Sequence, residues 1–317
     1  MQALQLRFLL VASLLTSLAG ASQAAETLVL SSVFVDQVKN KATIDATFEV
    51  DAHLKTPHPI SSGGNDGDIH MAGRADEIQL PVVAEIVNAR LEPDSMATLN
   101  HTSQGQKVPM TGVWRIWFEH LGTEDQIQGN PVDLPANSNP AHLFEVHPIT
   151  NFGGNNVLTS FAEIKGYTAY PAHVAFPFYE KAPATIQAAD GAISITSGEG
   201  KYNYAEFVIE LAGSAVCTDS TGTNVSCDDV EAKSLFVLAD VFDSQENAED
   251  PVTADARRMV FVVGTDPATQ VAKLSKGDRL HVLGIPRVNL SEVAAIAAQE
   301  ATQTHLPYEM IIVAVMP

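Results

Sequence analysis

The stretch that decides the fold runs from residue 66 to residue 149, and it reads DGDIH at 66–70, VAEI at 83–86, TGV at 111–113, FEH at 118–120 and FEVHP at 144–148. Apolar and polar residues alternate along much of it, and more cleanly at 43–51, which is the period-two pattern of half-buried strands. An apolar run at 28–35 indicates a further strand. We therefore predict strands at 28–35, 43–51, 68–73, 81–88, 108–120 and 142–151, a short helix within 89–107 and a long loop at 121–141.

The second half of the chain is also rich in strand signals, although it shows no fixed-period repeat. Residues 276–284 read KGDRLHVLG, a turn that leads into a strand, and Asn289 with Glu292 marks the start of a helix that we extend to Ala301. Further strands are predicted at 160–167, 204–212, 234–242, 258–264, 278–285 and 309–315. Many short strands with one helix near the fourth strand are typical of small closed barrels.

The predicted fold class is therefore all-β with one or two short helices, arranged as two tandem barrels like those that bind oligonucleotides and oligosaccharides (OB barrels). We place a signal peptide at 1–25, the first barrel at 26–152 and the second at 157–317. The segment GGNN at 153–156 marks the boundary between them.

The N-terminus has the features of a secretory signal peptide: a positive charge at Arg7, an apolar run at 8–18 and small residues at 19–25. The apolar run is too short to span a bilayer, and no later stretch is apolar for long enough. We predict a secreted or periplasmic protein. In that compartment Cys217 and Cys227, ten residues apart, are expected to form a disulfide, with a pair of free buried thiols as the alternative.

The chain is strongly acidic, with a formal net charge of −20 and a pI near 4.7. Such a charge keeps a protein soluble but opposes binding to nucleic acid or anionic lipid unless a basic patch or a bridging metal is present. The basic residues form no stripe along the chain. We therefore do not expect a nucleic-acid partner.

Seven of the ten histidines lie between residues 53 and 147, close to carboxylates. Strand alternation places Asp68 with His70, and Glu145 with His147, on shared faces. Because a small barrel has no room for unpaired ions in its core, these side chains should lie on outward faces or at strand ends. The predicted ligand or metal residues are Asp68, His70, Glu85, His120, Glu145 and His147.

Three interpretations of these residues stay open. Histidine and carboxylate ligands suit zinc or a comparable divalent ion. Cross-strand hydrogen bonds that only stabilise the sheet are an ordinary alternative, and general acid or base catalysis is a third. Adjacent strand residues face opposite sides, so His120 is not expected to contact Glu119. For the same reason Trp114 is expected in the core and Trp117 on the surface as a stacking platform.

The motifs also resemble a family of exported, mostly uncharacterised bacterial proteins with a single OB-like barrel. The family pattern is matched by Lys55, DGDIH at 66–70, AEI at 84–86, VPMTGV at 108–113, His120 and EVHP at 145–148. The match covers about residues 43–150. The chain departs from the pattern after AEI, in the spacing between Val108 and Thr111, and in the length of the loop at 121–141. The resemblance implies an OB-like barrel and no activity. Its signature positions in this chain would be Asp68, His70, Glu85, His120, Glu145 and His147.

We interpret the protein as an exported binding protein whose His/carboxylate surface patch binds a ligand, through a divalent metal in one version of this hypothesis. The ligand would be a small molecule, a glycan or a protein. One alternative is a metal-dependent hydrolase of the phosphodiesterase or nuclease type, and another is a purely structural envelope or matrix protein. The sequence contains neither a Gly-x-Ser-x-Gly elbow nor a phosphate-binding loop. We favour binding over catalysis.

Overall fold

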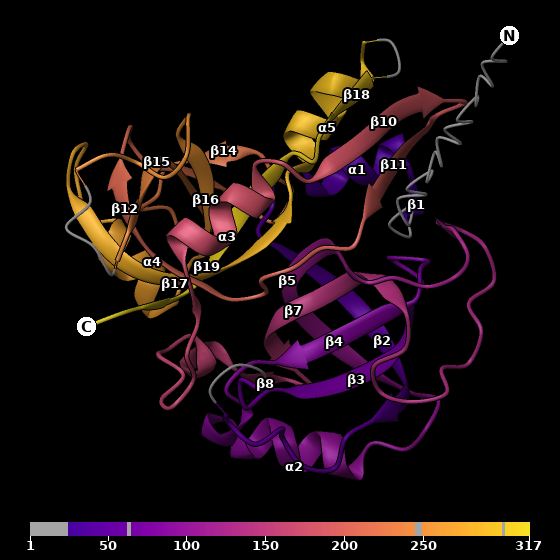
Figure 1. Ribbon diagram of the computed structural model, residues 1–317. Helices are drawn as coiled ribbons and strands as arrows, with labels where there is room; N and C mark the ends of the chain where they lie inside the picture. The colour runs from indigo at the N-terminus through magenta and orange to yellow at the C-terminus, as the bar shows by residue number, and fades with distance from the viewer. Residues whose placement is uncertain (1–24, 62–64, 245–248, 300–301) are drawn as a thin grey trace, which may run out of the picture.

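The computed structural model describes residues 25–61, 65–244, 249–299 and 302–317, so the predicted signal peptide lies outside the described residues except for Ala25. Figure 1 shows two β-barrels, one formed by the first half of the chain and one by the second, with a third sheet beside them. Both barrels are closed and five-stranded, which confirms the predicted fold class. The described residues contain five short α-helices, more than the one or two expected.

The first barrel has the strand order and helix position of an OB fold. Hydrogen-bonded pairs run from β2 through β3, β4, β7 and β5 back to β2. All of these pairs are antiparallel except β4 with β7, and helix α2 separates the third barrel strand from the fourth. The elements are β2 (Thr43–His53), β3 (Ile69–Ala75), β4 (Val82–Ile86), η1 (Ala89–Leu91), α2 (Pro93–His101), β5 (Gln106–His120), β7 (His142–Phe152) and β8 (Asn155–Asn156).

The second barrel has the same topology. Its pairs run from β12 through β15, β16, β19 and β17 back to β12, and only β16 with β19 is parallel. Helix α4 occupies the position that α2 has in the first barrel. The elements are β9 (Tyr170–Pro171), β12 (Ala205–Leu211), β13 (Val216–Thr218), β14 (Asn224–Val225), β15 (Ser234–Asp243), β16 (Arg257–Val262), α4 (Asp266–Val271), β17 (Arg279–Val288) and β19 (Tyr308–Val315).

The third sheet was not predicted, and it has the strand order β18-β10-β11-β1-β6. It is built from β1 (Ala25–Ser31), β6 (Gln126–Ile127), β10 (Pro183–Ala189), β11 (Ala192–Gly198) and β18 (Thr302–His305). The remaining helices are α1 (Ser32–Val38), η2 (Leu158–Ser160), α3 (Ala172–Tyr179) and α5 (Leu290–Ala297).

Two predicted strands were wrong. The run at 28–35 is a strand only to Ser31, where its pairing with β11 reaches the hairpin turn, and α1 then buries Phe34, Val35 and Val38 at helical spacing. Residues 160–167 form the end of a 3-10 helix and turns, because Phe161 and Ile164 are buried three residues apart instead of alternating. The predicted helix is confirmed as α5, whose start is capped by the Asn289 side chain, but it ends at Ala297 and not at Ala301; residues 300–301 lie outside the described residues.

The two barrels pack against each other through matching strands, β5 and β17. Arg115 Nε donates to the Pro286 carbonyl oxygen at 2.9 Å, and Arg287 Nη1 donates to the Trp114 carbonyl oxygen at 3.0 Å. Each arginine thus binds the backbone of the residue that precedes the other arginine. Each also faces a glutamate of its own barrel in register, Arg115 with Glu145 and Arg287 with Glu309. The interface therefore has an approximate two-fold symmetry.

Cys217 and Cys227 form the predicted disulfide in the connection between β12 and β15. Among the described residues, we find no helix with the length and apolar character that crossing a membrane requires.

Candidate functional site

Five of the six predicted site residues project outward from the first barrel, as expected. Asp68 and His70 alternate with Ile69 and Met71, whose side chains lie in the core. On β7, Glu145 and His147 point outward and alternate with core residues in the same way. The prediction of a surface patch was wrong, however, because Asp68, Glu85, Glu145 and His147 are buried. The segment that leads into the second barrel covers them: the Tyr204 hydroxyl lies 3.0 Å from His147 Nε2.

The buried side chains and the partly exposed His58 and His70 form one continuous series in which histidines and carboxylates alternate. His58 Nδ1 lies 2.9 Å from Asp68 Oδ1, and His70 Nε2 contacts Asp68 Oδ2 and lies 3.4 Å from Glu85 Oε1. Glu85 Oε2 in turn lies 3.1 Å from His147 Nδ1. We call this series, together with the residues of the next paragraphs, the His/carboxylate cluster. Its members are His58, Asp68, His70, Glu85, Glu119, His120, His142, Glu145 and His147.

The series continues from His147 to Glu145, whose Oε2 atom lies 3.5 Å from His147 Nδ1. Glu145 Oε1 lies 3.0 Å from His142 Nε2. His147 is fully buried, and its Nδ1 atom forms no hydrogen bond with any described residue, although it lies close to two carboxylate oxygens. Nδ1 is thus in ion-pair contact with both carboxylates, although neither contact has the direction of a hydrogen bond.

The far end of the cluster contains Glu119 and His120. His120 Nε2 lies 3.2 Å from Glu119 Oε1, so the prediction that these neighbours do not meet was wrong. The register of β5 with β7 is irregular between Ile116 and His120, which breaks the simple alternation of faces. Arg115 donates to Glu119 Oε2 at 2.7 Å and also binds Glu145 Oε2.

Sequence reasoning missed four members or partners of this cluster: His58, Glu119, His142 and Arg115. For two of these residues the sequence itself contains a signal. His58 and His142 belong to the dense group of histidines between residues 53 and 147, but neither sits beside a carboxylate in the pattern used to choose candidates. Glu119 was set aside by the alternation argument. The burial of Arg115 has no local mark, because two of its partners, Glu145 and Pro286, come from distant segments, and only Glu119 lies on the same strand.

Several carboxyl groups lie close together within the cluster. Burial, together with Asp68 and Glu145, raises the pKa of Glu85 well above its usual range. Burial and the charge of Asp68 raise the pKa of Asp66 to about 8. At the other end of the cluster, burial also raises the pKa of the carboxyl groups, but neighbouring cations outweigh this effect. Arg115 and His120 lower the pKa of Glu119 to about 2, and Arg115 helps to hold the pKa of Glu145 well below its usual range. Arg115 is the cation paired with these carboxylates among the described residues, so a bound cation would relieve the repulsion.

Three groups in the cluster have ligand atoms close enough to hold a metal ion: His58 with Asp68 and His70; Glu85 with Glu145 and His147; and His120 with His142 and Glu145. In each group the ligand atoms lie within 4.8 Å of one another. Imidazole nitrogen with carboxylate oxygen is a donor set that suits zinc and other first-row divalent ions. The six predicted residues are all distributed over these groups.

Trp117 is not a surface platform. It is 2 % exposed and packs edge-on against Tyr179, with ring centroids 5.6 Å apart. The predicted stacking role is therefore wrong for this side chain.

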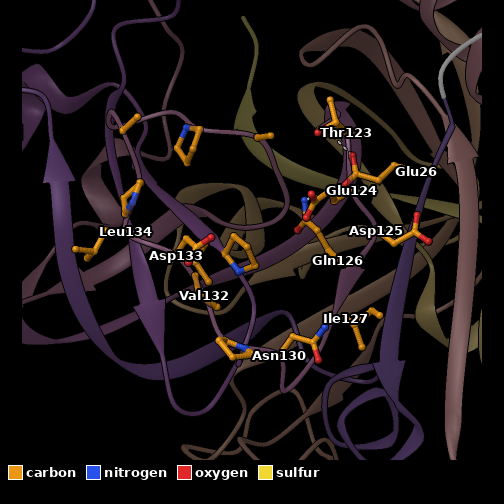
Figure 2. A pocket seen from close by; sticks show the side chains of 18 of the residues that line it. Glu26, Thr123, Glu124, Asp125, Gln126, Ile127, Asn130, Val132, Asp133 and Leu134 are labelled. Carbon is orange, nitrogen blue, oxygen red and sulfur yellow. Dashed lines mark hydrogen bonds between the residues drawn. The ribbon is translucent and has the colours of Figure 1, made fainter.

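The long loop at 121–141 lines a separate cavity of about 440 Å³, shown in Figure 2. Its labelled lining includes Glu26, Glu124, Asp125 and Asp133, so the cavity is acidic. Glu26 accepts hydrogen bonds from Gly122 N and from Gln126 Nε2, which anchors the start of the loop. The six predicted residues do not line this cavity.

Comparison with known proteins adds little. No protein-family model and no curated protein matches the chain. Among solved structures, the wild-type single-stranded DNA binding protein from Thermus aquaticus is 9 % identical, with a TM-score of 0.21, over 86 % of this chain and 90 % of that one. A deletion mutant of the same protein is 10 % identical, with a TM-score of 0.23, over 86 % and 91 %. TM-scores this low carry no argument about function, and the fold rests on the strand pairing.

Proposed function

We propose that this protein is an exported binding protein whose His/carboxylate cluster holds a divalent metal ion of the zinc type. The observation that carries the proposal is His147. Its Nδ1 atom is buried without a hydrogen bond, 3.1 Å from Glu85 Oε2 and 3.5 Å from Glu145 Oε2, while Tyr204 holds its Nε2 atom. Metal-bound histidines are commonly held in this way, with one ring nitrogen on the ion and the other hydrogen-bonded.

The charge balance supports the same proposal. Glu85 and Glu145 are buried and lie beside a third carboxylate, Asp68. Buried carboxylates without a cation are costly, and a divalent ion would neutralise them. The ion would be held by Glu85, Glu145 and His147, which we call the central position, with His70 beside Glu85. This position is closed to large ligands, so we propose binding and not hydrolysis as its role.

Export is proposed from the sequence features of residues 1–25 together with the disulfide, which oxidising compartments favour. The bound ligand of such a protein would be a small molecule, a glycan or a protein. The acidic surface argues against nucleic acid. The resemblance of residues 43–150 to exported OB-like proteins is consistent with this proposal.

Elemental analysis of the purified protein tests the proposal. We expect at least one equivalent of zinc, manganese or nickel per chain in the wild type and one equivalent less in His70→Ala/His147→Ala. His101→Ala is the matched control, because His101 lies in the same barrel, is exposed on α2 and binds only the Ala97 carbonyl oxygen. It should keep the metal. If wild type, after incubation with each ion and desalting, holds no metal, the histidines are structural and the proposal is overturned.

A further inference from the structure

We propose that a second divalent ion binds at the outer end of the cluster, on Glu119, His120, His142 and Glu145, and that Arg115 positions the two carboxylates for it. We call this the outer position. It extends the proposed function to a different set of atoms. The inference starts from the Oε1 atoms of the two glutamates, each of which faces a histidine: Glu145 Oε1 lies 3.0 Å from His142 Nε2, and Glu119 Oε1 lies 3.2 Å from His120 Nε2.

The two histidines lie side by side and present these nitrogens to the same region. Their rings stack with centroids 4.7 Å apart and an angle of 21° between the planes. The ligand atoms of His120, His142 and Glu145 all lie within 4.8 Å of one another. Separations of this size let small movements of the side chains bring the ligands to the distances of about 2.0–2.2 Å that zinc requires.

Three of the four ligands, Glu119, Glu145 and His142, are held on their other atom by a partner outside the position. Arg115 takes the Oε2 atoms of both Glu119 and Glu145, which leaves the Oε1 atoms free to face the histidines. His142 Nδ1 lies 2.8 Å from the Pro140 carbonyl oxygen and donates to it, so Nε2 carries the lone pair in the neutral ring. Partners of this kind orient metal ligands and fix the tautomer of a histidine.

The outer position differs from the central one in its access to solvent. The side chains of His120 and Glu119 are 34 % and 18 % exposed, whereas the residues of the central position are 5 % exposed or less. An ion at the outer position therefore has a face open to an external ligand, as in metal sites that bind or activate small molecules. Glu145 belongs to both positions, with Oε1 at the outer and Oε2 at the central one.

Cobalt binding separates the two positions, because Co²⁺ replaces zinc and absorbs visible light. We would measure the bound Co²⁺ by elemental analysis and its spectrum with and without azide, a small anion that can reach only the exposed ion. Five proteins are compared: wild type; two outer variants, His120→Ala and His120→Ala/His142→Ala; the central variant Glu85→Gln/His147→Ala; and His101→Ala/His281→Ala as a control outside the cluster.

We expect two ions per chain in wild type and control, and one in each outer and central variant. Azide should shift the spectrum of wild type and of the central variant but not that of the outer variants. Circular dichroism and a thermal melt show whether each variant is folded. His120→Ala is the variant least liable to unfold, because the His120 side chain is partly exposed. An outer variant that keeps every ion of wild type, or that keeps the azide shift, would overturn the second position while leaving the central one intact. A wild type without bound Co²⁺ would overturn both.

Discussion

The two barrels have the same topology and the same buried arginine–glutamate pair, yet their outer faces differ completely in chemistry. In the first barrel, Glu85 pairs across β3 and β4 with His70, and strand register sets Glu85 beside His147, two residues beyond Glu145. In the second barrel, Ile311 lies two residues beyond Glu309 and pairs with Val260. Val260 in turn pairs with Phe236 on the next strand. The positions of His70, Glu85 and His147 are therefore filled by Phe236, Val260 and Ile311.

This difference shows what the fold itself requires. Phe236, Val260 and Ile311 belong to an apolar cluster that also includes Val113 and Tyr204, so an apolar outer face is sufficient to bury this side of a barrel. The first barrel instead buries charges at a cost in desolvation. Neither closure of the barrel nor contact between the barrels explains that choice, because the second barrel achieves both without it. The proposed metal binding would explain it.

The largest expected effect tests what the barrels share. Glu145→Ala and Glu309→Ala each remove a carboxylate partner of a fully buried arginine, Arg115 or Arg287, although Arg115 keeps Glu119 as a second partner. Breaking a buried ion pair from one side costs about 3–5 kcal/mol, and we expect a loss of this size in both variants when unfolding is measured by denaturant in the presence of a chelator. Added metal should then stabilise Glu309→Ala and leave Glu145→Ala unchanged. Equal stabilisation of both by metal would contradict the comparison.

The connection between the first and second barrel strands also differs between the barrels. In the second barrel it carries the disulfide, and in the first barrel His58 and Asp68 lie at the corresponding place. Cys217→Ser/Cys227→Ser should lower the free energy of unfolding by about 2–4 kcal/mol, because the unfolded chain gains freedom. Metal content should not change. A reducing agent should destabilise wild type and have no further effect on the variant; a variant that loses metal would show that the two connections are coupled.

The strands that close both barrels could be predicted from the sequence, because their alternation and turns are local signals. It also gave the disulfide and six of the cluster residues. It could not give the third sheet, whose strand β1 pairs with β11 more than 150 residues away and has no local mark of that partner. Nor could it show that Glu85 and His147 are buried, because the residue that covers them, Tyr204, comes from the segment that enters the other barrel. Burial by a distant segment carries no periodicity, so an outward face was mistaken for an exposed one.

Removal of metal should have the next largest effect. A ligand at a hundred times its Kd stabilises the folded state by about 2.7 kcal/mol. For a chain of this size that corresponds to a rise in Tm of about 4–5 °C, measured as the difference between melts with zinc and with chelator. His147→Ala should reduce the difference to the part that the outer position contributes. Its counterpart Ile311→Ala should melt earlier under both conditions, because it leaves a cavity, and should keep the difference. Loss of the difference in Ile311→Ala would mean that the shift reports general stability.

The smallest expected effect comes from giving the first barrel the outer face of the second, through His70→Phe, Glu85→Val and His147→Ile together. Replacing buried charged groups by apolar residues is often neutral or stabilising, whereas Asp68 and Glu145 lose partners in this variant. We expect these effects to offset to within about 1 kcal/mol when the free energy of unfolding is measured in chelator. Metal at the central position should be absent. The reverse change, Ile311→His in the second barrel, should be strongly destabilising, because it buries an imidazole beside Val260 without a polar partner. If the triple variant were instead several kcal/mol less stable than wild type in chelator, the cluster would be a structural element of the first barrel, and its charges would need no ion to explain them.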